Sequence, residues 1–350
     1  MRFGRIRIED GFFIYNRHMM SNSIPVQDIL WGYHKTQTAD KRLERVLLSH
    51  VLVIITRRKK RYEFEMPERE AEDCILLLRA LNPEFVWGFP EGESIPLAGS
   101  PNVRDCGGFV TSEEHTILPR RLLYGGDLYH LSQADQRILL EEYHLRTVID
   151  LRSGTEILKR PDTEMAGVEY YHIPILDEEE EKDLHPGNWQ EMADSGEELS
   201  EEQMEKMYER FASDHYSVRQ FALFLDVLRK NEKGAVLWHG GAGKDRTGAA
   251  TALLLTILGV PRNVVRENYL RSNKALEQEE HYMRRMLESR GEDLSLYEQR
   301  LKNFYRVEES YLNRFFYRIN RTYGSIQRFL SDQLLLSPKE IDQLKERYLV

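Results

Sequence analysis

Two patterns of hydrophobic positions divide the chain into two parts. In the first part, short apolar runs are separated by polar turns, and one helical pattern closes the region, with Cys74, Leu77, Leu78 and Leu81 at i, i+3, i+4 and i+7. In the second part, β-branched runs alternate with longer helical patterns, as is typical of a parallel sheet flanked by helices. The sequence therefore predicts a small β-rich module, 1–98, followed by an α/β domain, 99–350, with a central, mostly parallel sheet.

Two hairpins are predicted in the first part. The predicted strands are Arg5–Ile8, Phe12–Tyr15, His50–Thr56 and Tyr62–Met66. The first pair flanks Asp10-Gly11, a strong hairpin dipeptide, and the second pair flanks the basic turn Arg57–Arg61. This order of strands, closed by a predicted helix over Glu68–Leu81, resembles a pleckstrin-homology-like module.

The basic turn Arg57–Arg61 has two interpretations. It is a candidate for weak contact with a lipid surface, and it also fits a solvated hairpin tip whose charges block pairing at the edge of the sheet. After the helix, the irregular stretch Asn82–Pro101 is rich in proline and glycine and is the predicted linker.

The second part contains three predicted strands and a series of helices. The strands are Arg146–Leu151, Tyr170–Ile175 and Ala235–Trp238. The helices are Ser132–Glu142, Ser200–Ala212, Ser217–Lys230, Arg262–Lys274, Glu277–Arg290 and Leu296–Tyr323, and a last one begins at the capping box Ser337–Glu340. The glutamate-rich stretch 184–214 fits either a mobile flap or an exposed polar insertion.

A glycine-rich loop follows the strand Ala235–Trp238 and precedes an uninterrupted apolar run, which predicts a buried helix. Inward backbone N–H groups, the positive end of a helix and a guanidinium together favour an anion, and a phosphate ester is the predicted ligand. The nucleotide-binding loop is a poor alternative, because Gly243-Lys244 is followed by Asp245 and Trp238 stands where that motif needs its first glycine.

The stretch His239–Gly248, HGGAGKDRTG, resembles the signature of the cysteine-dependent phosphatases in the form typical of the bacterial atypical tyrosine and phosphoinositide phosphatases. Gly240 stands where that family has its nucleophilic cysteine. Further likenesses are the opening NVRDCGG, the element LYGGDL, the run DLR and the C-terminal tail, with Cys106 and Tyr124 replacing a leucine and an arginine. The resemblance covers about 102–350.

The resemblance implies how the site would work and what Gly240 removes. A thiol at a helix N-terminus has its pKa lowered from about 8.5 to roughly 3.5–7.5, so that a thiolate attacks phosphorus. Glycine keeps the backbone N–H but has no nucleophile. We therefore expect binding of phosphorylated ligands without turnover. Gly240 is either an engineered replacement or the mark of a natural pseudophosphatase, and the sequence leaves both open.

The resemblance also assigns roles to other residues. The predicted phosphate-binding residues are Gly241, Ala242, Gly243, Lys244, Arg246 and Thr247, with Arg246 also in a catalytic role. Asp177, in the acidic run after the second strand, and Asp245, inside the loop, are rival general acids. His239, Asp150 and Arg152 are expected to support the loop.

Composition places limits on the partners. The net charge of −9 argues against general nucleic-acid binding, and the expected ligand is a phosphorylated protein or a phosphoinositide. Only Cys74 and Cys106 are present, neither has a phosphate loop around it, and no apolar run is long enough for an integral membrane segment. The pattern favours a cytoplasmic bacterial protein, and the chemistry needs no metal and no cofactor.

Overall fold

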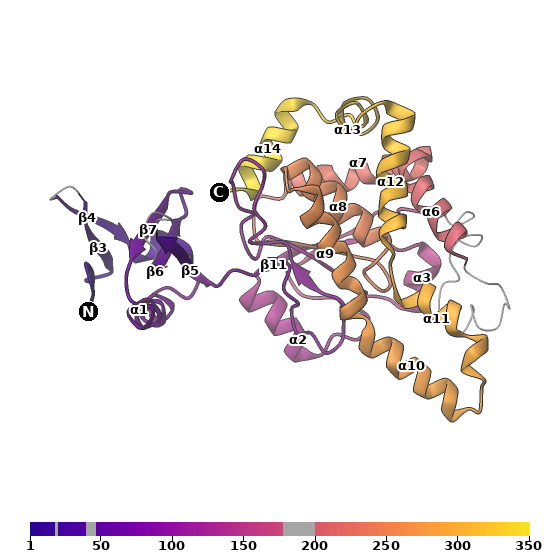
Figure 1. Cartoon of the computed structure of the whole chain (residues 1–350), viewed down its shortest axis with the longest axis horizontal. Helices are drawn as coiled ribbons and strands as arrows, with labels where there is room; N and C mark the ends of the chain where they lie inside the picture. The colour runs from indigo at the N-terminus through magenta and orange to yellow at the C-terminus, as the bar shows by residue number, and fades with distance from the viewer. Residues whose placement is uncertain (18–19, 40–46, 178–199) are drawn as a thin grey trace. The chain divides into compact units, whose positions relative to one another are not determined.

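The computed structural model describes residues 1–17, 20–39, 47–177 and 200–350, which fall into two compact units, Met1–Pro90 and Glu91–Leu349 (Figure 1). The division lies inside the predicted linker Asn82–Pro101. Each unit has its own hydrophobic core.

The first unit contains two four-stranded sheets and one helix. The first sheet is antiparallel and has the order β1 (Arg2–Phe3), β2 (Ile6–Glu9), β3 (Phe12–Arg17), β4 (Met20–Pro25). The second has the order β7 (Arg61–Glu65), β6 (Leu47–Thr56), β5 (Ile29–Ala39), β8 (Val86–Trp87). Both predicted hairpins are confirmed, and Asp10 and Gly11 adopt φ of 51° and 78° in the first turn. Strands β4 and β5 have no counterpart among the predicted elements.

Helix α1 (Glu68–Leu81) has the predicted bounds, but its buried face is rotated from the predicted one. Ala71, Cys74, Ile75 and Leu78 are buried, whereas Leu81 is 41% exposed. The core therefore takes side chains from Ala71 through Leu78, and the helix leaves it only at Leu81.

The second unit is built on a five-stranded sheet with the order β12 (Glu169–His172), β11 (Leu145–Asp150), β13 (Ala235–His239), β10 (Leu122–Gly125), β9 (Arg104–Asp105). The strands β10 to β13 are parallel and β9 is antiparallel. This confirms the predicted fold class, and the strand-like run that precedes the glycine loop is the central strand.

Alternate side chains of the central strands enter different cores. Val236 and Trp238 belong to one cluster, whereas Ala235 and Leu237 belong to the other. Because side chains alternate across a strand, both faces of the sheet are buried, as parallel sheets require. In Figure 1, α2 lies on one side of β11, and α7, α8 and α12 lie on the other.

The larger core is formed mainly by helices. They are α6 (Glu201–Ser213), α7 (His215–Lys230), α8 (Arg246–Leu258), α9 (Arg262–Ala275), α12 (Glu309–Tyr323) and α14 (Pro338–Tyr348). On α8, every residue but Thr256 is buried, which confirms the interpretation of its apolar run. The helix ends at Gly259, whose φ of 90° suits glycine in a C-terminal cap.

Smaller helices complete the unit. They are α2 (Gln133–Arg137) with the π-turn η2 (Ile138–Glu142), α3 (Gly154–Lys159), α10 (Glu277–Ser289), η3 (Leu294–Leu296), α11 (Glu298–Tyr305), and α13 (Ile326–Arg328) with the π-turn η4 (Phe329–Gln333). The predicted capping box at Ser337 is confirmed, and the predicted helix start at Ser132 is confirmed as an N-cap that also forms a capping box with Asp135.

The prediction of one helix over Leu296–Tyr323 is wrong. The chain breaks between α11 and α12, where Val307 is fully buried and Asn273 of α9 binds both its backbone N–H (2.7 Å) and its carbonyl (3.0 Å). These two tertiary hydrogen bonds replace the helical ones at the break.

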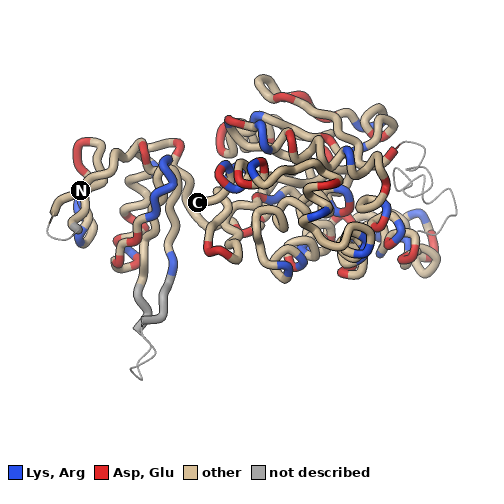
Figure 2. Tube along the Cα trace, turned by 90° about the horizontal axis from the view of Figure 1, so that it is seen from above, with Lys and Arg blue, Asp and Glu red and all other residues tan. Residues whose placement is uncertain are grey.

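Most of the predicted flap, 184–214, lies outside the described residues, as does the acidic run that follows Asp177. The helix predicted at its end is confirmed as α6, with Ser200 as its N-cap. No helix in the described ranges has both the length and the apolar character needed to cross a membrane. Acidic and basic residues are interspersed along the second unit (Figure 2).

Candidate functional site

The glycine loop, 240–245, lies at the carboxyl edge of the parallel sheet. It follows β13 and leads into α8, and β10 and β11 end beside it at Gly125 and Asp150. Sites of open α/β sheets form at this edge, because parallel strands all end there. The residues predicted for the site are therefore brought to one place by the sheet itself.

Gly243 brings the loop into direct contact with the turn after β10. Its φ is 70°, and a Cβ atom built on it would lie 2.3 Å from the carbonyl carbon of Gly125. The loop is fixed further by Asn102, whose amide donates to the Gly243 carbonyl at 2.7 Å. The backbone N–H of Asp127 donates to the Gly241 carbonyl at 2.9 Å. The loop conformation thus depends on glycine at position 243.

The loop offers backbone N–H groups at its centre. Among the described residues, none accepts a hydrogen bond from the amides of Gly241, Ala242 or Gly243. Buried amides are normally paired, and the N-terminus of α8 adds positive potential at the same place. This arrangement is suited to holding an anion.

Arg246, the first residue of α8, forms a bidentate ion pair with Glu156 of α3. Its Nη1 and Nη2 atoms lie 2.5 Å and 2.8 Å from the two carboxylate oxygens. The same carboxylate accepts the N–H of Ser153 in a capping box, so α3 fixes its position. Sequence reasoning missed Glu156, because a capping glutamate gives no sign of a distant arginine.

A second ion-pair network supports the loop from the end of β13. His239 is fully buried, and its Nε2 lies 2.8 Å from Asp162. Arg152 binds Asp150 through Nε at 2.9 Å and Nη2 at 2.6 Å, and binds Asp162 through Nη2 at 2.7 Å. The structure therefore joins the three predicted support residues and adds Asp162. A metal does not fit between Asp150, Asp162 and His239, since a guanidinium already holds both carboxylates.

The network shifts the pKa values of its members. Burial alone would lower the pKa of His239, but the carboxylates of Asp150 and Asp162 outweigh burial and raise it. Burial would likewise raise the pKa of Asp150, but the charge of His239 and the hydrogen bonds from Arg152 hold it below its ordinary value. A charged imidazole and a charged carboxylate therefore stabilise each other beneath the loop.

Lys244 and Asp245 belong to a buried network on the helical side of the loop. The Lys244 ammonium lies 2.7 Å from the Asp245 carboxylate and 3.3 Å from the carbonyls of Asn303 and Arg306. The Tyr208 hydroxyl donates to Asp245 at 3.0 Å. Sequence reasoning missed these partners, which lie on α6 and at the C-terminal end of α11. Phosphate contact by Lys244 and acid catalysis by Asp245 remain predictions.

Asp177, the other candidate acid, is half-buried and is the last described residue before 178–199. It follows Ile175, whose N–H bonds to the Leu151 carbonyl at 3.3 Å beside the end of β11. Its position after β12 agrees with the predicted order of elements, and its role stays a prediction.

Gly240 is the position where the site lacks a side chain. A Cβ atom built there would lie 3.1 Å from Thr247 Oγ1 and 3.9 Å from Arg246 Nε. Thr247 is fully buried, and its hydroxyl has no hydrogen-bond partner within the described chain. Buried hydroxyl groups are normally paired. The backbone at Gly240 thus leaves room for a side chain that would approach this hydroxyl.

The opening NVRDCGG braces the loop against α9. Buried Arg104 donates to the Asn268 carbonyl at 2.7 Å and to Ser272 Oγ at 2.9 Å. Tyr124 donates to the Asn268 side chain at 2.7 Å and stacks on Trp238. The motif recognised in the sequence is therefore structural support for β10, β13 and the loop between β13 and α8.

Comparison with known proteins agrees with this arrangement. Residues 95–350 match the tyrosine phosphatase family. The chain is 30% identical over 263 residues to the triple specificity protein phosphatase PtpB of Mycobacterium tuberculosis, which covers 67% of this chain and 92% of that protein. A putative tyrosine-protein phosphatase of Cupriavidus necator is 28% identical over 251 residues, covering 71% and 85%. A tyrosine-protein phosphatase of Nostoc commune is 32% identical over 153 residues, covering 43% and 48%.

Replacing Gly243 with alanine should disrupt the loop. The new Cβ would overlap the Gly125 backbone, and φ of 70° is unfavourable for alanine. We expect the free energy of unfolding in urea to fall by about 2 kcal/mol or more. Gly241→Ala is the matched control, because its Cβ meets only Glu156 Oε1, at 3.5 Å. Equal effects of the two substitutions would contradict the assigned contact.

The raised pKa of His239 should make stability fall at alkaline pH. A group whose pKa is raised by folding contributes stability below its ordinary pKa of about 6.5, and this is lost as the pH rises through the folded value. In the unchanged chain, we expect the free energy of unfolding in urea to fall by an amount on the order of 1 kcal/mol between pH 6 and pH 9. In His239→Gln this fall should be absent. His281→Gln, at an exposed position of α10, should keep the decrease. A decrease that persists in His239→Gln would assign it to another group.

Proposed function

This chain belongs to the tyrosine phosphatase family, and we propose that it is a phosphoester monoesterase scaffold that binds a phosphate group without hydrolysing it. The proposed ligand is phosphotyrosine in a protein or a phosphoinositide. The observation that carries the proposal is the geometry of Gly240, where a side chain would point at the Thr247 hydroxyl and the Arg246 guanidinium.

A cysteine at position 240 would find the environment that its chemistry needs. Its thiolate would accept a hydrogen bond from Thr247 Oγ1, which is buried and has no partner within the described chain. The N-terminus of α8 would lower the pKa of the thiol. Attack on phosphorus would form the S–P bond of a phosphocysteine and break the bond to the ester oxygen, which is a tyrosine phenolate or an inositol alkoxide. The general acid would give this oxygen a proton, and water would then hydrolyse the intermediate to phosphate and free thiol. Glycine cannot form that bond.

Phosphate binding does not need the missing side chain. The amides of Gly241, Ala242 and Gly243 belong to the backbone, and Gly240 leaves them in place. Arg246 provides a planar fork that matches two phosphate oxygens. Glu156 fixes the orientation of this guanidinium before any ligand arrives, which lowers the entropic cost of binding. We infer that recognition is retained while catalysis is absent.

Two histories fit this proposal. Gly240 is either an engineered replacement in an active phosphatase or the natural residue of a pseudophosphatase that recognises phosphorylated protein or lipid. The retention of Asp245, Arg246 and Thr247 favours a recent loss of the nucleophile, because these residues serve the missing chemistry. The codon at position 240 in the gene separates the two histories.

Contact between the first unit and a lipid surface is a weaker proposal. The turn between β6 and β7 carries Arg57, Arg58, Lys59 and Lys60. Arg57 is already paired with Glu84 and with the Gln27 carbonyl, so it acts partly as a brace within the unit. The remaining turn residues are the candidates for headgroup contact.

Restoring the nucleophile should create a phosphatase. We expect Gly240→Cys to hydrolyse p-nitrophenyl phosphate and either phosphotyrosine peptides or inositol lipids, with a rate at least about 10³-fold above that of the unchanged chain. Initial rates of phosphate release measure this effect.

The control for this experiment is Gly240→Ser, which has a side chain of similar size without a thiol and should stay inactive. Calorimetry with tungstate should show binding to the unchanged chain in the same buffer. A folded Gly240→Cys protein that binds tungstate but cleaves none of the substrates would contradict the proposed phosphatase scaffold. An unchanged chain that binds no oxyanion would contradict the proposed phosphate site in the loop.

The general acid can be identified in the Gly240→Cys background. Asp177→Asn and Asp245→Asn each remove one candidate carboxylic acid, and loss of the true acid should slow esters with poor leaving groups most. We expect the true acid's variant to lose about 10²-fold or more on phosphotyrosine peptide and much less on p-nitrophenyl phosphate. Because Asp245 also binds Tyr208 and Lys244, unfolding curves must accompany its rates. An equal loss on both substrates would indicate structural damage.

A further inference from the structure

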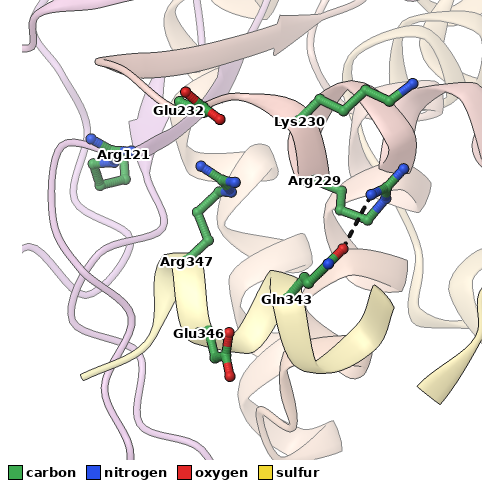
Figure 3. A pocket seen from close by; sticks show the side chains of 7 residues that line it. All are labelled: Arg121, Arg229, Lys230, Glu232, Gln343, Glu346 and Arg347. Atoms are coloured by element: carbon green, nitrogen blue, oxygen red, sulfur yellow. Dashed lines mark hydrogen bonds between the residues drawn. The ribbon is translucent and has the colours of Figure 1, made fainter. Parts of the chain in front are cut away.

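A pocket of about 550 Å³ is lined by residues that precede β10 and β13 (Figure 3). It lies at the edge of the central sheet where these strands begin, whereas the glycine loop lies at the edge where they end. Arg121 lies directly before β10, Glu232 lies shortly before β13, and Arg229 and Lys230 end α7. Helix α14 lines one side of this solvent-open pocket and contributes Gln343, Glu346 and Arg347.

Among the basic residues that line the pocket, Arg229 and Lys230 have acidic partners, whereas Arg121 has none in the described chain. Arg229 is hydrogen-bonded to Asp226 at 2.6 Å and to Gln343 at 3.1 Å, and Lys230 lies 2.6 Å from Asp226. These two cations have partners on their own side of the cavity. Arg121 has neither an ion pair nor a side-chain hydrogen bond among the described residues, and its Nε is buried without a partner.

Arg347 adds a second positive charge close to Arg121. Its Nη1 donates to the Asn231 carbonyl at 2.5 Å, while its buried Nε has no partner within the described chain. In Figure 3 its guanidinium lies between Arg121 and Arg229. Burial lowers the pKa of Arg121, and the charge of Arg347 lowers it further. Two guanidinium groups that repel each other across a cavity are favoured by an anion between them.

We propose that this cavity binds a small phosphorylated polyol, such as a sugar phosphate, with its phosphate held by Arg121 and Arg347. Guanidinium groups match phosphate oxygens in pairs, and the volume lies in the range of ligand pockets. The exposed carboxylate of Glu232 disfavours a bare polyanion and accepts hydrogen bonds from hydroxyl groups of the ligand. The site uses no residue of the glycine loop.

Calorimetry with glucose 6-phosphate tests this site in a chain whose loop is disabled by Arg246→Met. We expect one-to-one binding to survive in Arg246→Met and to weaken about tenfold or more when Arg121→Gln is added. Glucose without phosphate should give no heat. The matched control is Arg328→Gln, at an exposed position of α13, which should leave the affinity unchanged.

Arg121→Gln should fold normally, because its side chain has no hydrogen-bond or ion-pair partner among the described residues. Thermal unfolding should show a Tm equal to or above that of the unchanged chain. Arg347→Gln is the second variant and should weaken binding to a similar degree. Binding that disappears with Arg246→Met alone would place the ligand in the glycine loop. Binding that persists in Arg121→Gln and Arg347→Gln, or none in any variant, would overturn the proposed cavity site.

Discussion

The close contact between Gly243 and the backbone of Gly125 is the constraint on which the rest of the site depends. It holds the glycine loop against the end of β10, and a Cβ atom at Gly243 would overlap that backbone. The side-chain amide of Asn102 also donates a hydrogen bond to the carbonyl of Gly243. The buried α8 then fixes where the loop ends, because its apolar residues contribute to the main core. The geometry of the loop amides, which are the proposed anion site, is therefore determined by the fold of the whole second unit.

The groups proposed to bind phosphate are therefore positioned independently of the side chain at position 240. The amide groups of the loop belong to the backbone and stay in position whichever side chain stands at 240. The ion pair between Arg246 and Glu156 and the network around His239 come from α3, β11 and β13, and they are complete without a nucleophile. The buried Thr247 hydroxyl, by contrast, has no hydrogen-bond partner in the described chain and lies 3.1 Å from a Cβ built on Gly240. The proposed loss of catalysis with retained binding therefore requires a change at one position only.

Features that depend on neighbouring residues were predictable from the sequence, and features that depend on distant contacts were not. The glycine loop, the buried α8, both hairpins and the capping boxes at Ser132 and Ser337 follow from local patterns. Glu156 and Asp162 were missed because their partners, Arg246 and His239, are far away in the sequence, and no local pattern indicates these pairs. The break at Val307 was missed for the same reason, since Asn273 of another helix replaces the local hydrogen bonds.

Because contacts between distant residues decide where charges gather, the overall charge is a poor guide to anion sites in this chain. The net charge is −9, yet cationic groups gather at both edges of one sheet. At one edge, Arg246 and the amides of the loop converge because parallel strands end together. At the other edge, Arg121 and Arg347 meet only because α14 packs beside the beginning of β10. Fields at short range are set by the few groups that lie within a Debye length of about 10 Å, so local arrangement outweighs net charge. The two proposed anion sites therefore differ in their donors, which are mainly backbone amides at one edge of the sheet and guanidinium groups at the other.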